Sequence, residues 1–284
     1  MRQGAGTDLM DTIVQALIMG IVQGLTEFLP VSSSAHLIVV PFLFGWDDAF
    51  INSLAFSVML HIGTLCALLV YFRADWVRLV PAGLAAVRDR SFRGDPDRRL
   101  AWLLVAATIP AALAGMLLGD LIETSFREIG LVAVTLVVGG AILWLADRHG
   151  GRTKGVHDVT LPVAIGIGAA QALALVPGIS RSGISISAAR FAGLDRPAAA
   201  RFSFLMATPI TAGAALFEAR RLIAGESGVD VSVVPLVVGM IAAFVSGALA
   251  ISVLLRYLQT RSLDAFVWYR VVLSAVILVV WLAR

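Results

Sequence analysis

The stretch QGLTEFLPVSSSAHL covers residues 23–37 and interrupts an otherwise apolar chain with a carboxylate, Glu27, and a helix breaker, Pro30. A second polar stretch, PGISRSG, covers residues 177–183 and contains Arg181. The helical segment that follows each turn holds only about a dozen residues, which at 1.5 Å per residue is roughly 18 Å and too short to cross a bilayer. We therefore predict that each polar stretch lies at the tip of a helical hairpin that enters and leaves the membrane on one side.

The composition is that of an integral membrane protein. Of the 284 residues, 59% are apolar and 14% are charged, and the mean hydropathy is +0.90, whereas soluble domains carry roughly a quarter charged residues. The net charge of +3 is spread between the apolar runs, which argues against nucleic-acid binding. The single cysteine, Cys66, excludes an intramolecular disulfide. The first apolar run has no basic leader and no cleavage signal, so we expect it to be retained.

Apolar length and helix breakers predict ten helical segments, at about residues 12–29, 34–45, 51–72, 100–119, 128–147, 160–176, 181–191, 200–221, 233–256 and 265–283. Five segments follow the same order in each half. We predict an all-α polytopic membrane protein, a single integral membrane domain over residues 1–284. It consists of two inverted five-helix repeats, about 8–150 and 158–284, each with one re-entrant helical hairpin and three transmembrane helices.

The distribution of basic residues predicts the orientation. Four linkers are rich in arginine and should lie in the cytoplasm: 73–99, 147–158, 190–201 and the one after Leu255. The linkers at 120–128 and 218–230 carry more acids than bases and should lie outside. If each hairpin returns to its starting side, the first hairpin enters from outside and the second from the cytoplasm. Binding sites in such inverted repeats form where two broken elements meet near the midplane.

The second polar stretch has the composition of a phosphate cradle. Gly178 and Gly183 let the backbone approach a ligand, Ser180 and Ser182 supply hydroxyls, and Arg181 offers a fork that matches two phosphate oxygens. A helix that begins near Arg181 would also direct unpaired N–H groups at an anion. The alternative is that the small residues only allow close helix packing, but that role does not explain Arg181.

The first polar stretch supplies oxygen ligands. Gln23 and Glu27 are four residues apart, share a helix face, and suit a divalent cation, magnesium or calcium, that would bridge to diphosphate oxygens. The alternative for Glu27 is a plain ion pair with Arg181. A charged side chain near mid-bilayer costs about 2.5–3.5 kcal/mol. We therefore expect Glu27 and Arg181 to face one another or a shared ligand.

The serines and the histidine that follow are the candidate reacting groups. Ser33 is the candidate nucleophile, and His36 the candidate general acid or base, or the acceptor of the phosphoryl group. Ser32 and Ser34 could bind substrate phosphate or cap the short helix. For two further polar residues a structural role is favoured: His61 as a packing residue, and Arg270 as a side chain that extends to the membrane surface. The alternative for each is a direct role in the site.

Both polar stretches, together with FSFLMATP at residues 202–209 and WYR at 268–270, resemble the undecaprenyl-diphosphate phosphatases linked to bacitracin resistance. The resemblance covers nearly the full chain. It implies a multi-pass protein of the bacterial plasma (inner) membrane that releases inorganic phosphate from the polyprenyl diphosphate carrier of cell-wall synthesis. It also implies a required divalent cation and a fold of inverted repeats that opens outward.

The resemblance also assigns residues. Glu27 and Gln23 match the acidic motif of the family, Ser33 and His36 match its proposed reacting pair, and Arg181 with Ser180 matches its phosphate-binding residues. This chain has Gln23 where some relatives have glutamate, and Ala35 where glycine is common.

Two functions remain open from the residues alone. The first is hydrolysis of a lipid diphosphate, and the second is a transporter or flippase of a lipid phosphate or small anion. The grouping of acid, nucleophile and histidine at one hairpin tip favours the enzyme, since anion transport does not need it. The partners expected are the lipid substrate and membrane lipids, and the sequence allows a homodimer.

Overall fold

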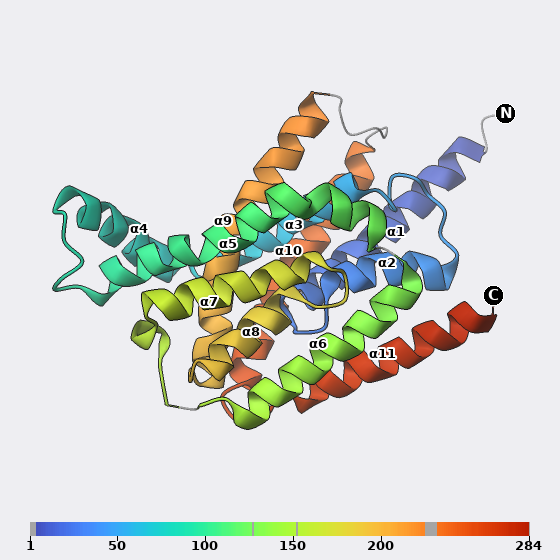
Figure 1. Cartoon of the computed structure of the whole chain (residues 1–284). Helices are drawn as coiled ribbons and strands as arrows, with labels where there is room; N and C mark the ends of the chain where they lie inside the picture. Colours follow the sequence, from blue (N-terminus) through green and yellow to red (C-terminus); the bar gives the residue numbers. More distant parts are fainter. Residues whose placement is uncertain (1–3, 127, 152, 225–231, 284) are drawn as a thin grey trace.

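The computed structural model describes residues 4–126, 128–151, 153–224 and 232–283, and this part of the chain is helical (Figure 1). The α-helices are α1 (Gly4–Phe28), α2 (Ser33–Phe44), α3 (Leu54–Tyr71), α4 (Arg73–Arg88), α5 (Pro96–Ser125), α6 (Ile129–His149), α7 (Leu161–Ala172), α8 (Arg181–Phe191), α9 (Arg196–Ile223), α10 (Val233–Tyr257) and α11 (Asp264–Ala283). Two short 3₁₀ turns, Val156–Asp158 and Leu173–Leu175, precede and follow α7.

All ten predicted segments are present as helices, but the prediction of a continuous loop from 73 to 99 is wrong. Residues Arg73–Arg88 form α4, which packs on α5. Its exposed apolar residues recur at helical spacing, at Val77, Val80, Leu84 and Val87. Charged residues of α4, among them Arg73, Arg78 and Arg88, keep the segment below the hydropathy of a membrane span, which is why apolar length alone did not find it.

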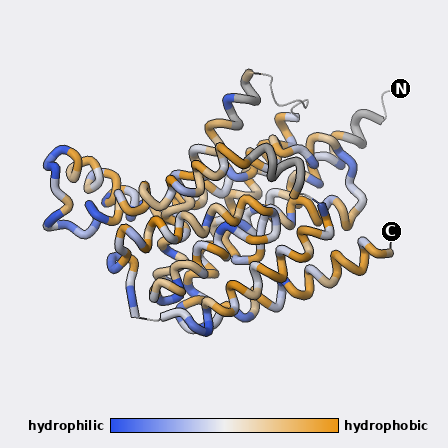
Figure 2. Tube along the Cα trace, in the orientation of Figure 1, coloured by the Kyte–Doolittle hydropathy of each residue, from blue (hydrophilic) through white to orange (hydrophobic). Residues whose placement is uncertain are grey.

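Seven of the described helices are long and apolar enough to cross a membrane: α1, α3, α5, α6, α9, α10 and α11. Helix α1, expected as one arm of the first hairpin, is thus long enough to span by itself over Leu9–Phe28. Helices α2 and α8 contain 12 and 11 residues. Figure 2 shows the resulting pattern, with mostly hydrophobic helices and hydrophilic stretches concentrated at the bends.

The long helices pack in pairs that are distant in sequence. Helix α1 lies along α10, α7 along α5, α3 against α9, and α6 beside α11. Glycines allow the closest approaches, because a Cβ added at Gly20 would lie 2.2 Å from the carbonyl oxygen of Gly239 on α10. The same holds for Gly168 on α7, where the added Cβ would lie 1.9 Å from the Ala107 carbonyl oxygen on α5. Small residues therefore bring both hairpins against the bundle.

The four basic linkers lie together at one end of the bundle, as predicted. Arg196 donates to both carboxylate oxygens of the buried Asp147 at 2.6 and 2.9 Å, and the Leu263 amide donates to the same carboxylate at 3.1 Å. Arg201 donates to the Asp75 carboxylate at 2.6 Å, which joins the linker at 190–201 to the one at 73–99. Arg152 and part of the linker at 218–230 lie outside the described residues.

Candidate active site

Each polar stretch turns into its short helix through a serine with an unusual backbone. Ser32 has φ 75° and Ser180 has φ 77°, a region that non-glycine residues rarely adopt. Each side chain caps the helix that follows, since Ser32 Oγ accepts from the Ala35 amide at 3.4 Å and Ser180 Oγ from the Gly183 amide at 3.1 Å. The two turns are thus built alike and hold strained conformations of the kind that persist at functional sites.

The two turns contact each other directly. The Gly178 amide donates to Ser32 Oγ at 3.2 Å, and Ser182 Oγ donates to the Leu29 carbonyl oxygen at 3.2 Å. Within the turns, Ser34 Oγ lies 3.2 Å from Ser32 Oγ. Residues from positions 29–34 and 177–183 therefore form one polar cluster inside the bundle.

Glu27 contacts both parts of this cluster, through Ser33 and Arg181, and we include it in the polar cluster. It is 7% exposed. Its Oε2 accepts hydrogen bonds from Ser33 Oγ at 2.5 Å and from Gln23 Nε2 at 3.2 Å. His61 Nε2 lies 3.4 Å from the same oxygen, and Arg181 NH1 lies 3.7 Å from Oε1. The carboxylate therefore has a hydroxyl, an amide and two basic side chains around it.

Arg181 is the first residue of α8 and is less buried than Glu27. Its side chain is 30% exposed, and NH1 donates to Thr211 Oγ1 on α9 at 2.7 Å. The adjacent hydroxyls of Ser180 and Ser182 lie 3.3 Å apart. Because the contact of Arg181 with Glu27 is long for an ion pair, the guanidinium has room to bind an anion as well.

His36 is buried, and both of its ring nitrogens are occupied. Nδ1 lies 2.7 Å from the Ser32 carbonyl oxygen, which can only accept, so Nδ1 carries the proton. Nε2 then accepts from the Tyr269 hydroxyl at 2.7 Å, and the two rings are stacked with centroids 5.6 Å apart. Within the described chain Ser33 bonds to Glu27 and His36 to Ser32 and Tyr269, and no hydrogen bond joins His36 to Ser33 directly.

Several residues of the site were not assigned to it from the sequence. His61, expected to be a packing residue, lies against Glu27, and its Nδ1 is 2.8 Å from the Ser57 carbonyl oxygen. Thr211 on α9 contacts Arg181, and Tyr269 on α11 contacts His36. The expectation that Arg270 extends to the membrane surface is wrong, because it is 0% exposed. A cationic side chain within an apolar run was the signal that could have identified Arg270.

The residues around Glu27 fit a divalent cation in part. Gln23 Oε1 is buried without a hydrogen-bond partner, and it lies beside the Glu27 carboxylate that Gln23 Nε2 contacts. Magnesium is often held by one or two carboxylates while substrate phosphates and water complete its shell. The described residues contain no group of three or more His, Cys, Asp or Glu that could hold a metal. A cation here would therefore depend on substrate oxygens.

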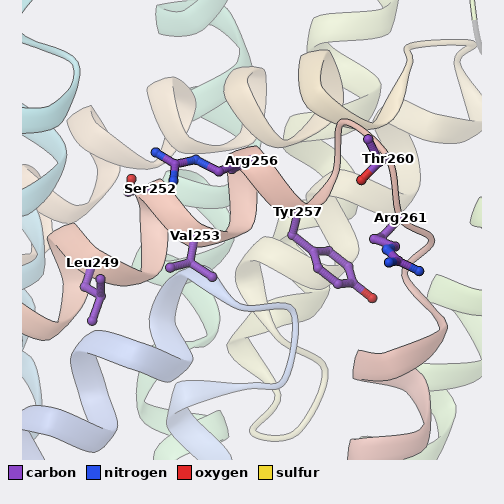
Figure 3. A pocket seen from close by; sticks show the side chains of 7 residues that line it. All are labelled: Leu249, Ser252, Val253, Arg256, Tyr257, Thr260 and Arg261. Carbon is purple, nitrogen blue, oxygen red and sulfur yellow. The ribbon is translucent and has the colours of Figure 1, made fainter.

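A surface cavity of about 430 Å³ lies elsewhere, on the second half of α10 and the turn to α11 (Figure 3). It is lined by Leu249, Ser252, Val253, Arg256, Tyr257, Thr260 and Arg261. None of these residues belongs to the polar cluster around Glu27. The candidate catalytic residues of the two polar stretches therefore lie between helices, and they are separate from this open cavity.

Comparison with known proteins identifies the family. The family described as bacitracin resistance protein BacA matches residues 16–276. An undecaprenyl-diphosphatase of Desulforudis audaxviator is 47% identical over 270 residues, which is 95% of this chain and 98% of the relative. One of Gemmatimonas aurantiaca is 48% identical over 266 residues, with 94% and 97% covered. One of a Nocardioides species is 45% identical over 270 residues, with 95% and 97% covered. This chain therefore belongs to the bacitracin resistance protein BacA family.

Proposed function

We propose that this chain hydrolyses undecaprenyl diphosphate to undecaprenyl phosphate and inorganic phosphate, as the names of its relatives state for them. One observation carries the proposal: Glu27 from the first polar stretch and Arg181 from the second lie 3.7 Å apart inside a membrane bundle. A carboxylate, a guanidinium and hydroxyls from both halves of the chain are costly to bury without a polar ligand. A diphosphate headgroup has the charge and the oxygens to match them.

The second polar stretch binds the phosphates in this proposal. Arg181 offers its guanidinium, and the start of α8 directs amide groups and a partial positive charge toward the same place. Ser180 and Ser182 line the turn. Gly178 and Gly183 are assigned to the same phosphate-binding set; an added Cβ at Gly178 would meet Thr135 Oγ1 at 1.9 Å and one at Gly183 would meet Ser180 Oγ at 3.1 Å, so both glycines let the turn pack closely on its neighbours. Ser32 and Ser34 are assigned to the same phosphate-binding set, because the Ser32 hydroxyl already contacts the Gly178 amide.

The first polar stretch supplies the reacting group. Ser33 Oγ donates a 2.5 Å hydrogen bond to Glu27, so Glu27 is placed to take the serine proton. Ser33 then attacks the terminal phosphorus, the bond to the bridging oxygen breaks, and the prenyl phosphate leaves. Water hydrolyses the phosphoserine and releases inorganic phosphate. The alternative, direct attack by a water that Glu27 activates, uses the same base. Positive charge from Arg181 stabilises the phosphoryl oxygens in either case.

His36 is the proposed proton carrier, and its surroundings specify how it would act. With Nδ1 bound to the Ser32 carbonyl oxygen, only Nε2 can exchange a proton, and Nε2 faces the Tyr269 hydroxyl. Tyr269 is 45% exposed. We therefore assign proton exchange by His36 to a path through this hydroxyl.

We also propose a divalent cation, magnesium or calcium, held by Glu27 and Gln23 together with substrate oxygens. The buried and unpartnered Gln23 Oε1 supports this assignment. Bound there, a cation would neutralise charge on the diphosphate oxygens. The Gln23 amide nitrogen meanwhile orients the Glu27 carboxylate through their hydrogen bond.

The arrangement of helices supports two inverted repeats, with α2 and α8 as the short arms of re-entrant hairpins. Counting five helices in each half and leaving out α4, the first helix of each half packs on the fourth helix of the other half, α1 on α10 and α7 on α5. The third helices, α3 and α9, contact each other, and so do the fifth, α6 and α11. A pseudo-two-fold axis would generate these pairings. With the arginine-rich end in the cytoplasm of a bacterial inner membrane, the first hairpin opens outward.

Phosphate release by the purified protein tests the proposed function. The protein in detergent with magnesium is given undecaprenyl diphosphate, and released phosphate is followed over time. We expect continuous turnover, whereas a protein that only transports a lipid phosphate or anion would release none. A prenyl diphosphate of shorter chain, run in parallel, reports the contribution of the apolar tail to KM.

Substitutions in the two charged residues connect the activity to the site. Glu27→Ala and Arg181→Ala should each abolish release while the protein remains folded and monodisperse. Arg88→Ala is the matched control, because the Arg88 side chain is 80% exposed and its ion-pair partner among the described residues is its neighbour Asp89. Robust turnover in Glu27→Ala or Arg181→Ala would contradict the assignment, and a loss in Arg88→Ala would show that the assay is not specific.

A further inference from the structure

Arg270 is the most deeply buried cation near the polar cluster, and it has no ion pair within the described residues. Its side chain is 0% exposed, and neither Nε nor NH1 has a hydrogen-bond partner. An unbalanced guanidinium inside a membrane bundle is expensive to maintain. Its position therefore calls for a function other than packing.

The contacts that Arg270 does make are with the backbone of the second polar turn. NH2 donates to the carbonyl oxygens of Gly178 and Ile179, the latter at 2.7 Å. These two carbonyls lie between Gly178, with φ 101°, and Ser180, with φ 77°. Buried carbonyl oxygens need a donor, and Arg270 supplies one nitrogen to both. A strained turn is thereby held by a side chain from α11.

The same turn is also connected to the first one through α11. Tyr269, the neighbour of Arg270, donates to His36, and His36 donates to the Ser32 carbonyl oxygen. Ser32 Oγ accepts from the Gly178 amide, and the Gly178 carbonyl oxygen accepts from Arg270. These bonds close a ring that joins both turns to two consecutive residues of α11. Such closed networks hold their members in one geometry.

Helix α6 leaves space for the guanidinium at one glycine. A Cβ added at Gly139 would lie 2.6 Å from Arg270 NH2 and 2.8 Å from the Ile179 carbonyl oxygen. At the next residue, Gly140, the added Cβ would make only ordinary contacts with Arg270, at 3.7 Å. NH1 points toward the first turn of α8, where it lies 3.4 Å from an ideal Cβ at Gly183.

We propose that Arg270 is a positioning residue for the phosphate-binding turn: it holds the carbonyls of Gly178 and Ile179 toward α11, so that Ser180, Arg181 and the start of α8 keep the geometry that receives the diphosphate. This inference rests on the proposed function only for its kinetic consequence. The positioning itself is a statement about residues 177–183 and can be measured without substrate.

The first test is Arg270→Gln, measured by hydrogen exchange of the amides in residues 176–184 and by phosphate release. Without the guanidinium we expect at least tenfold faster exchange in this segment. We expect KM for the prenyl diphosphate to rise about 10- to 100-fold, because a displaced turn binds the phosphates more weakly and each tenfold loss of affinity is about 1.4 kcal/mol. Exchange at wild-type rates in a folded Arg270→Gln protein would overturn the proposal.

Because loss of a buried guanidinium can unfold a protein, the second test retains Arg270 and disturbs the contact between its NH2 and the Ile179 carbonyl oxygen, both of which the added Cβ at position 139 would meet. Gly139→Ala should speed exchange of residues 176–184 and raise KM in the same direction, whereas Gly140→Ala should match wild type within twofold. Equal effects of the two alanines would refute the proposal. If the wild-type protein released no phosphate, the proposed function would fail, but the exchange measurements would still decide the role of Arg270.

Discussion

Glu27→Gln tests how the carboxylate acts, because it removes the charge while keeping the size of the side chain. In the structure Glu27 accepts a 2.5 Å hydrogen bond from Ser33. A hydrogen bond to a charged group contributes about 1.5–3 kcal/mol, and general-base catalysis contributes about 10²- to 10⁴-fold in rate. We therefore expect kcat for phosphate release to fall about 10²- to 10⁴-fold, or roughly 3–5.5 kcal/mol in activation free energy.

A double-mutant cycle with Ser33→Ala separates this mechanism from others. If Glu27 works by taking the proton of Ser33, the two residues act as one unit, and Glu27→Gln/Ser33→Ala should be no slower than the worse single variant. The assay is the initial rate of phosphate release at saturating substrate, with each variant checked for monodispersity. Losses that multiply in the double variant would refute the reasoning, as would a Glu27→Gln protein that retains more than a tenth of wild-type kcat.

Three further outcomes are expected. Gly168→Ala should destabilise the protein by about 1–3 kcal/mol, because its Cβ would lie 1.9 Å from the Ala107 carbonyl oxygen; Gly166→Ala, with nothing within 4 Å of the added Cβ, should not, and thermal unfolding compares the two. Chelation with EDTA should abolish phosphate release, and added magnesium or calcium should restore it; full activity after exhaustive chelation would exclude the cation. Asp147→Asn should lower the unfolding temperature by several degrees with kcat nearly unchanged, because Asp147 binds Arg196 at the basic end and lies outside the site. A selective loss of kcat in Asp147→Asn would show instead that this end of the bundle affects catalysis.

The helices could be predicted largely from apolar length, because a bilayer sets a minimum for the length of each span. Helix α4 was missed because its arginines conceal an amphipathic repeat from a search for apolar runs. The site was predicted where a residue type is costly in its own segment, as for Glu27 and Arg181. Thr211 is ordinary in its segment, and a histidine such as His61 is also compatible with packing, so only their positions in the folded chain reveal that they contact Arg181 and Glu27.

From the amino-acid sequence it follows that this chain is helical, that it lies in a membrane, and that its two polar turns need polar partners. These properties follow from the free energy of transferring each segment into lipid, which depends on local composition. Which side chains contact one another depends on the packing of the helices. In the folded chain Tyr269 bonds to His36, which is 233 positions away in the sequence, and Arg270 donates to two carbonyl oxygens of the second polar turn. Such contacts depend on how distant helices pack, and side-chain chemistry alone leaves several partners open for every buried donor and acceptor.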